Sequence, residues 1–313
     1  MKRAILLCLI CIMMIIAGCG SGSQQPKNTG AMKELTFGVM PDVDSVPLVI
    51  AQEKGYFKEE GVKVNLKTFK SAMDRDAALQ SGNLDGTISD MLAAAFAKSG
   101  GFDVKVTSIS DGAYLLVTSD KTIKTIADLK GSETAVSRNT IIEYVTDRML
   151  VQAKQAPDSI EKVVIPQIPV RLEMLQNGKL TAATLPEPMA SVAIAGGCQL
   201  IASSHDLGIV PGIMLFTGRS AKEKTAEIKA FYRAYNKAVN YLNNANRDDY
   251  IPVLIDKAGF PKAAAAVLKL PEYNQAKIPA ETDFSACIDW LKGKNLLKGE
   301  VGYDQLVTKD LLP

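Results

Sequence analysis

The chain has 313 residues, of which 47% are hydrophobic, and it carries 36 basic and 34 acidic side chains. This length supports one large domain or two lobes with hydrophobic cores of their own. The near balance of charge argues against nucleic acid or another polyanion as a partner, because such partners require a basic surplus. The chain has one histidine, and no paired-cysteine motif occurs beyond residue 18, which argues against a His/Cys metal site there.

The N-terminus has the organisation of an export signal. Lys2 and Arg3 precede an apolar run over residues 4–16, and two small residues then lead to Cys19. The run is shorter than the about 20 residues that a membrane-spanning helix needs. We therefore predict a cleaved signal peptide over residues 1–18 rather than a transmembrane anchor. The sequence at the cut resembles a bacterial lipoprotein lipobox, which implies that Cys19 is lipidated.

A mature chain that begins at Cys19 would be held at a membrane from outside the cytoplasm. Each buried methylene of an acyl chain contributes about 0.8 kcal/mol to such an anchor. Residues 19–32 are polar and contain Gly and Pro, which predicts a flexible tether. We expect a Gram-positive cell surface, because a single-membrane cell has no periplasm to retain an untethered protein. Cys198 and Cys287 could form a disulfide or stay as buried thiols.

From residue 35 onward, strand and helix patterns alternate. A strand pattern at 35–39 precedes a helix that begins at Pro47 and ends before Gly55. The next predicted elements are strands at 62–69, 84–88 and 104–109, and helices at 71–81 and 91–98. Such β-α-β-α-β alternation with short loops predicts an α/β fold with a parallel sheet covered by helices.

A second α/β set begins near residues 113–117. It contains predicted strands at 134–136, 163–168, 182–185 and 200–203, and a helix at 140–153. Residues 213–217 look like a returning strand. The remainder is mostly helical, over 221–243, 248–258, 261–268 and 282–292.

These segments together resemble a known family, the periplasmic-type solute-binding proteins of ABC importers. Within it, the chain is most similar to the group that serves nitrate, aliphatic sulfonates, taurine and the pyrimidine precursor of thiamine. The segments that carry the resemblance are 35–41, 46–61, 79–86, 126–131, 135–140 and 185–188. Among them, Gly55-Tyr-Phe-Lys-Glu-Glu-Gly61 is the most specific.

The resemblance implies a type II periplasmic binding protein with two lobes and two hinge crossovers. Lobe 1 would combine residues 33–112 with 214–313, and lobe 2 would span 118–206. The hinges would then fall at 113–117 and 206–213. The resemblance also implies a ligand between the lobes, a permease as partner and uptake driven by a cytosolic ATPase. We expect a monomer with no cofactor.

Ligands of open α/β sheets bind where strands end and helix N-termini begin. The candidate ligand-binding residues at such positions are Asp42, Asp44, Ser45, Ser89, Asp90, Tyr114, Ser137, Arg138, Asn139, Thr140 and Glu187. Several have a second interpretation, because Asp42, Asp44, Ser45 and Asp90 can cap helices. Tyr114 can either stack on a flat ligand or pack in a hinge.

The charges in these loops bear on the class of ligand. Asp42, Asp44, Asp90 and Glu187 stand against Arg138 alone. This acidic surplus favours a neutral or amine-bearing molecule, such as an aminopyrimidine-like ring, over a sulfonate or nitrate. Helix dipoles contribute only about 0.3–1 kcal/mol each to anion binding near a surface.

An enzyme on the same fold is the main alternative. A serine hydrolase needs a histidine base, and His205 is the single histidine of the chain. No Gly-x-Ser-x-Gly turn, Gly-x-Gly-x-x-Gly fingerprint or phosphate-binding loop occurs in the sequence. A lipoprotein that acts through protein contacts is a third possibility, and it would require a large exposed apolar patch.

Overall fold

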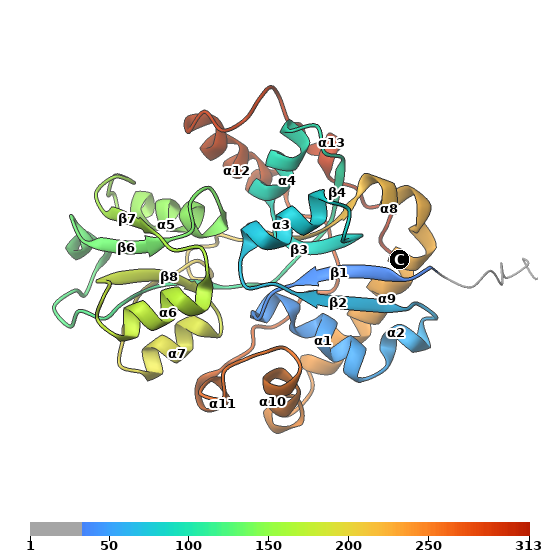
Figure 1. The fold of residues 1–313 in the computed structure, drawn as a ribbon, viewed down its shortest axis with the longest axis horizontal. Coiled ribbons are helices and arrows are strands. Elements are labelled where there is room, and N and C mark those ends of the chain that lie inside the picture. Colours follow the sequence, from blue (N-terminus) through green and yellow to red (C-terminus); the bar gives the residue numbers. More distant parts are fainter. Residues whose placement is uncertain (1–32) are drawn as a thin grey trace, which may run out of the picture. The chain divides into compact units, whose positions relative to one another are not determined.

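Two mixed β-sheets with helices around them make up residues 33–313, which are the residues that the computed structural model describes (Figure 1). The predicted signal peptide, the lipidation site Cys19 and the predicted tether lie outside these residues. The described residues belong to one compact unit. The predicted α/β fold class is confirmed.

The first sheet has the strand order β2-β1-β3-β10-β4. Its strands are β1 (Leu35–Val39), β2 (Val64–Thr68), β3 (Gly86–Asp90), β4 (Val104–Ile109) and β10 (Gly212–Thr217). The helices that precede or follow these strands are α1 (Val46–Glu53), α2 (Tyr56–Glu59), α3 (Ala72–Gln80), α4 (Met91–Ser99), α8 (Gly218–Glu223) and α9 (Thr225–Leu242). The C-terminal helices are α10 (Arg247–Asp256), α11 (Ala264–Val267), α12 (Glu281–Gly293) and α13 (Tyr303–Leu306).

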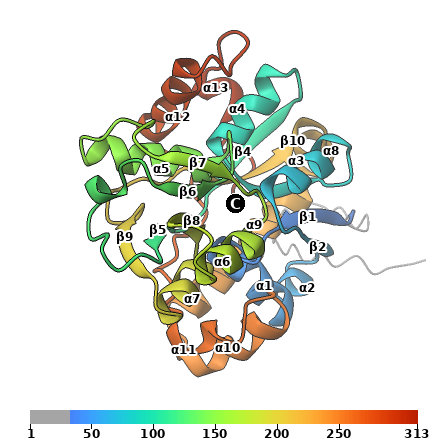
Figure 2. The same ribbon diagram turned by 60° about the vertical axis from the view of Figure 1, so that its left-hand side comes forward.

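The second sheet has the order β7-β6-β8-β5-β9 (Figure 2). Its strands are β5 (Tyr114–Thr118), β6 (Glu133–Val136), β7 (Glu161–Val164), β8 (Ala182–Pro186) and β9 (Gln199–Ser203). Its helices are α5 (Ile141–Gln152), α6 (Ile168–Gln176) and α7 (Met189–Ala195). The strand predicted at 163–168 is wrong at its end, because α6 begins at Ile168.

The prediction of a parallel sheet is wrong for two strands. β10 is antiparallel to β3 and β4, and β5 is antiparallel to β8 and β9. The first residue of β5, Tyr114, pairs with the last residue of β8, Pro186. Likewise, the first residue of β10, Gly212, pairs with the last residue of β3, Asp90. The chain therefore enters each sheet from the edge where the other strands end, and a strand that enters there must run the opposite way.

Residues 110–113 and 204–211 connect the two sheets. Residues 114–117 of the first predicted hinge lie within β5, and the second predicted hinge, 206–213, runs from a turn into β10. The lobe boundaries at 33–112 with 214–313 and at 118–206 stay predictions. Within the described residues, no helix is both long enough and apolar enough to cross a membrane.

Local sequence signals account for the helix that leads away from the first strand. Pro47 lies in the first turn of α1, where a missing N–H costs nothing. Gly55 follows the helix with a φ of 76°, a left-handed conformation that glycine adopts without strain. In the core, the ring of Phe231 on α9 lies 4.8 Å from that of Phe37 and 5.6 Å from that of Phe216. These contacts join α9 to the first sheet.

Gly86 tests how tightly β3 packs between its neighbours. A Cβ at this position would lie 2.5 Å from the backbone oxygen of Leu215 on β10. We expect Gly86→Ala to lower the free energy of unfolding by about 1–3 kcal/mol, because a strand must shift to admit the methyl group. Urea denaturation measures this change.

The matched control is Gly293→Ala at the end of α12. A Cβ there meets no atom within 4 Å, and alanine favours a helix by up to about 1 kcal/mol. Equal effects of the two substitutions would contradict the packing that the structure gives for Gly86.

Candidate ligand-binding site

A small cavity of about 40 Å³ lies between the two sheets, at the edges where their strands end. The side of the first sheet contributes Met40, Asp42, Asp44, Ala72, Arg75, Ile88, Ser89 and Asp90. The side of the second sheet contributes Tyr114, Ser137, Thr140, Ile141, Ile142, Pro166, Ile168, Arg171 and Pro186. A molecule in this cavity would touch both halves of the fold.

Three carboxylates of the first half line the cavity, and all three are buried. Burial raises the pKa of Asp42 well above its usual range, and the neighbouring Asp44 adds to this effect. Burial also raises the pKa of Asp44 and of Asp90 to about 6. Asp90 caps α4 as predicted, since its carboxylate accepts from the N–H of Ala93 at 2.8 Å. Asp90 therefore both caps α4 and lines the cavity.

Two buried arginines line the cavity, and sequence reasoning missed both. Arg75 on α3 donates through Nε to Asp76 at 2.8 Å, and its Nη2 lies 3.9 Å from Asp90 Oδ2. Arg171 on α6 is 1% exposed and donates through Nη1 to the backbone oxygen of Thr184 at 2.6 Å. Burial lowers the pKa of Arg171 to about 9. A charged residue within a short helix normally faces solvent, so no sequence signal marked either one.

Among the described residues, four buried polar atoms of cavity-lining side chains have no hydrogen-bond partner: Asp44 Oδ1, Arg75 Nη2, Ser89 Oγ and Arg171 Nε. Arg75 Nη2 lies 2.8 Å from Asp76 Oδ1 in an ion pair, so the other three atoms have unused hydrogen-bonding capacity. Buried polar atoms without partners are rare, because each costs about 1–3 kcal/mol. These three offer two acceptors and two donors to a bound molecule, since a hydroxyl can do both.

The structure brings seven of the predicted site residues to the cavity: Asp42, Asp44, Ser89, Asp90, Tyr114, Ser137 and Thr140. The other four lie elsewhere. Ser45 is buried and donates its hydroxyl to the backbone oxygens of Met40 and Asp42, so it shapes the loop. Arg138 and Asn139 are exposed.

Glu187 precedes α7, and its side chain is held by a residue of that helix. Its two carboxylate oxygens accept from the N–H and the hydroxyl of Ser191, at 2.9 and 2.7 Å. Burial raises the pKa of Glu187. Its backbone oxygen accepts from the N–H of Val43 at 3.1 Å, which joins the two halves of the fold through the main chain. The charges at the cavity are therefore three acids with Arg75 and Arg171, rather than four acids with Arg138.

Cys198, Cys287 and His205 do not line the cavity. In residues 33–313, no group of three or more His, Cys, Asp or Glu side chains is arranged to hold a metal ion. Cys198 and Cys287 are both buried and free. The His205 side chain is 76% exposed.

A family model, curated relatives and solved structures all match this chain. The family model described as NMT1/THI5 like matches residues 42–247. A Bacillus subtilis (strain 168) protein, named for binding aliphatic sulfonates, is 24% identical over 249 residues, which cover 76% of this chain and 74% of that protein.

Solved structures share the two-lobed fold. The alkanesulfonate-binding protein SsuA from Xanthomonas axonopodis pv. citri, bound to MOPS, superposes with a TM-score of 0.74 at 19% identity, covering 90% of this chain and 99% of that chain. The desulfurization enzyme DSZB also shares the fold, with a TM-score of 0.67 at 13% identity over 89% and 97% of the chains. The fold is thus common to binding proteins and to at least one enzyme.

The raised pKa values of the cavity carboxylates predict how stability depends on pH. Asp44 and Asp90 take up a proton near pH 6 when folded, whereas an unfolded aspartate does so near pH 3.9. The folded state therefore binds more protons between these values, so the free energy of unfolding rises as the pH falls from 7 to 5. We expect Asp90→Asn to remove part of this rise, which urea denaturation at each pH measures.

Asp85→Asn is the matched control. Asp85 pairs with Lys224 at 2.7 Å, and its pKa is lowered, so it stays ionised throughout this pH range. Its substitution should leave the change between pH 7 and 5 as it is in the wild type. Identical pH profiles for wild type and Asp90→Asn would contradict the raised pKa.

Proposed function

Because this chain belongs to the NMT1/THI5-like family, we propose that it is a solute-binding protein that delivers a small organic molecule to the permease of an ABC importer. The observation that carries the proposal is the cavity between the two sheets, lined by buried charged side chains from both. The names of sulfonate-binding and ABC-transporter relatives support it. The protein binds its ligand without chemistry and works as a monomer outside the cytoplasm.

The charges of the cavity indicate the chemistry of the ligand. Asp42, Asp44 and Asp90 can accept hydrogen bonds from an amine or amidine, and such a partner would lower the cost of their burial. Arg171 can donate to an acceptor at the other end of the molecule, such as a ring nitrogen or a sulfonate oxygen. The ligand is therefore a small molecule with a nitrogen donor at one end and an acceptor at the other, as in an aminopyrimidine or an aminosulfonate.

A thermal-shift screen tests this ligand class. The panel contains an aminopyrimidine, taurine, butanesulfonate and nitrate. At equal concentrations, we expect the compounds with an amino group to stabilise the protein most, because they bind most tightly. A ligand present at 100 times its dissociation constant stabilises by about 2.7 kcal/mol. Butanesulfonate or nitrate binding as tightly as both amino compounds would contradict the assignment, and turnover of any compound would favour an enzyme.

Substitutions then locate the binding groups. We expect Asp42→Asn to weaken binding of the compound selected by the screen about tenfold or more, because a charge-assisted hydrogen bond is worth about 1.5–3 kcal/mol. Arg138→Ala is the control, since the exposed Arg138 does not line the cavity. Calorimetry measures both affinities. A loss for Arg138→Ala with none for Asp42→Asn would place the site elsewhere.

An enzyme is the second candidate, because the desulfurization enzyme DSZB shares the fold. Neither cysteine nor histidine occurs among the residues that line the cavity in the described part of the chain. A cysteine or serine nucleophile is usually activated by a histidine base, and the cavity wall supplies none. The lining thus favours binding over nucleophilic catalysis.

The lipid anchor on Cys19 is proposed from the sequence at the signal cleavage site. We expect Cys19→Ala to move the protein from the membrane fraction to the soluble fraction, and to abolish metabolic labelling with palmitate, because the acylated thiol is lost. Cys198→Ala is the control, since this buried residue plays no part in the anchor. Continued membrane attachment of Cys19→Ala would contradict the proposal.

A further inference from the structure

Asp42 and Asp44, two of the three carboxylates of the cavity wall, lie on the loop between β1 and α1. Hydrogen bonds within the loop fold it: the N–H of Asp42 donates to the backbone oxygen of Met40 at 2.8 Å, and the Ser45 hydroxyl donates to the same oxygen at 2.7 Å. A loop folded only by its own bonds can still move as a whole against the sheet. Its attachment to the rest of the fold therefore decides where the two carboxylates point.

Tyr273 attaches this loop to a segment 230 positions later in the chain. Its hydroxyl donates at 2.8 Å to the backbone oxygen of Val43, the residue between Asp42 and Asp44. Tyr273 is buried, and its ring packs in the same hydrophobic cluster as Val43. Burial raises the pKa of Tyr273 well above its usual range, and the charge of Asp44 adds to this effect. The hydroxyl therefore keeps its proton and stays a donor.

The segment that carries Tyr273 is a strap, residues 268–280, that contains no helix or strand. Its backbone is held by other parts of the fold instead. Asn243 Nδ2 donates to the backbone oxygen of Tyr273 at 2.9 Å, and Asn243 Oδ1 accepts from the N–H of Tyr273 at 3.0 Å. Further along the strap, the backbone oxygen of Lys277 accepts from the N–H of Ile109, at the end of β4, at 2.8 Å. The strap is thus fixed on both sides of its contact with the loop.

Asn274, the next residue of the strap, holds the backbone on which Asp44 packs. Its N–H and its Nδ2 donate to the two carboxylate oxygens of Asp111, at 2.8 and 2.6 Å. Asp111 precedes Gly112 in a connection between the sheets, and a Cβ at Gly112 would lie 2.0 Å from Asp44 Oδ2. Adjacent residues of the strap therefore hold both the loop that carries Asp44 and the backbone that its carboxylate contacts.

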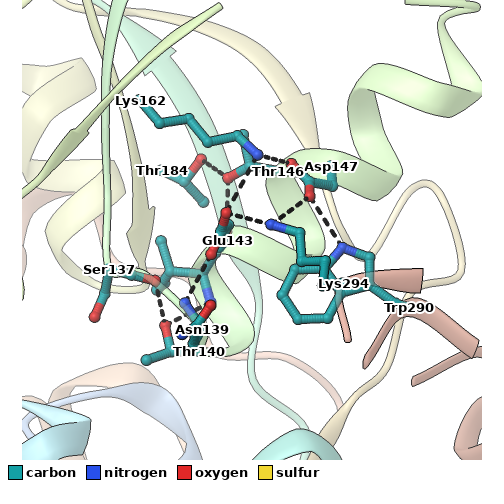
Figure 3. A network of polar contacts seen from close by, with 11 residues as sticks. Ser137, Asn139, Thr140, Glu143, Thr146, Asp147, Lys162, Thr184, Trp290 and Lys294 are labelled. Atoms are coloured by element: carbon teal, nitrogen blue, oxygen red, sulfur yellow. Dashed lines mark hydrogen bonds and ion pairs between the residues drawn. The ribbon is translucent and has the colours of Figure 1, made fainter. Parts of the chain in front are cut away.

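The cavity loop of the second half is held in a different way (Figure 3). Its residue Asn139 donates its N–H to Glu143 on α5 at 2.7 Å. Glu143 and Asp147, one turn later, contact Lys162 on β7 and Lys294, which follows α12. This loop is supported from four positions away, by the helix that it leads into. The loop of the first half depends instead on a distant part of the chain.

The tyrosine hydroxyl contributes position more than stability. A phenylalanine at residue 273 would fill the same space, and one neutral hydrogen bond adds only modestly to the free energy of unfolding. A binding group, however, must be held within about 0.5 Å of its productive position. A hydrogen bond to the backbone between two carboxylate residues supplies this restraint.

We propose that Tyr273 and Asn274 are positioning residues of the ligand-binding site. Neither lines the cavity, and both act through the backbone that carries or contacts Asp44. They fix the direction in which Asp42 and Asp44 meet the nitrogen donor of a bound molecule. Their role rests on the proposed function, because the cavity must be the ligand site.

Hydrogen exchange in the ligand-free full chain tests the attachment of the loop. We expect Tyr273→Phe to accelerate amide exchange at residues 42–46 about three- to tenfold, because the ring stays and one hydrogen bond is lost. Tyr232→Phe is the matched control, since Tyr232 is buried in the same hydrophobic cluster and its hydroxyl meets Thr107 rather than the loop. Unchanged exchange in Tyr273→Phe, or equal acceleration in Tyr232→Phe, would overturn the positioning role.

Calorimetry with taurine and with the aminopyrimidine of the panel tests the consequence for binding. We expect Tyr273→Phe and Asn274→Ala each to weaken binding of the tighter of these two compounds about three- to tenfold. Gln275→Ala should bind as the wild type, because the exposed Gln275 bonds to Asn240 and not to the loop or to Asp111.

The outcomes separate this role from the proposed function. A merely structural role would lower the free energy of unfolding of Tyr273→Phe and Tyr232→Phe alike and leave both affinities unchanged. Faster exchange at residues 42–46 with unchanged affinity would therefore overturn the role in binding. Failure of both amino compounds to bind the wild type would contradict the proposed function itself.

Discussion

The direction in which the chain crosses between its two sheets is the constraint on which the site depends. Both crossings take place at the edges where β1, β3, β6 and β8 end, so these edges face each other. The loops that follow the strands then converge, and their helix-capping residues become the wall of one cavity. Asp90 illustrates this double use, because the carboxylate that caps α4 also lies at the cavity.

Convergence of capping residues has an electrostatic consequence. A single capping aspartate at a surface costs little, but here the capping residues Asp42 and Asp90 are brought together with Asp44 out of water. Their raised pKa values measure that cost, and the buried Arg75 reduces it only in part. A bound molecule that supplies a positive or hydrogen-donating nitrogen would offset the rest. This cost of burial is the basis of the ligand class that we propose for the cavity.

The interface between α5 and α12 applies the same physics outside the cavity. There the buried acids Glu143 and Asp147 are compensated by lysines, one from each half of the fold. The compensation is complete only when the halves meet. Glu143 also accepts from the N–H of Asn139, in the loop that carries Ser137 and Thr140. The 137–140 loop therefore contacts both sites of buried charge.

Most of the local elements could be predicted from the sequence, although the end of the strand predicted at 163–168 was wrong. Pro47 and Gly55 bounded α1, Asp90 marked the start of α4, and the alternation of patterns indicated an α/β fold. The motifs over most of the chain indicated the family. These features could be predicted because caps, turns and periodicity are set by residues close in the chain.

Which charges face one another follows from the folded arrangement and not from local sequence. Arg75 and Arg171 reach the cavity from the interiors of short helices, and Glu143 meets Lys294 across 151 positions of sequence. The antiparallel direction of β5 and β10 was also not predicted, because the direction of a strand depends on where the chain enters the sheet. Burial and pairing of charge are properties of surfaces that meet only after folding. Local pattern carries no information about them.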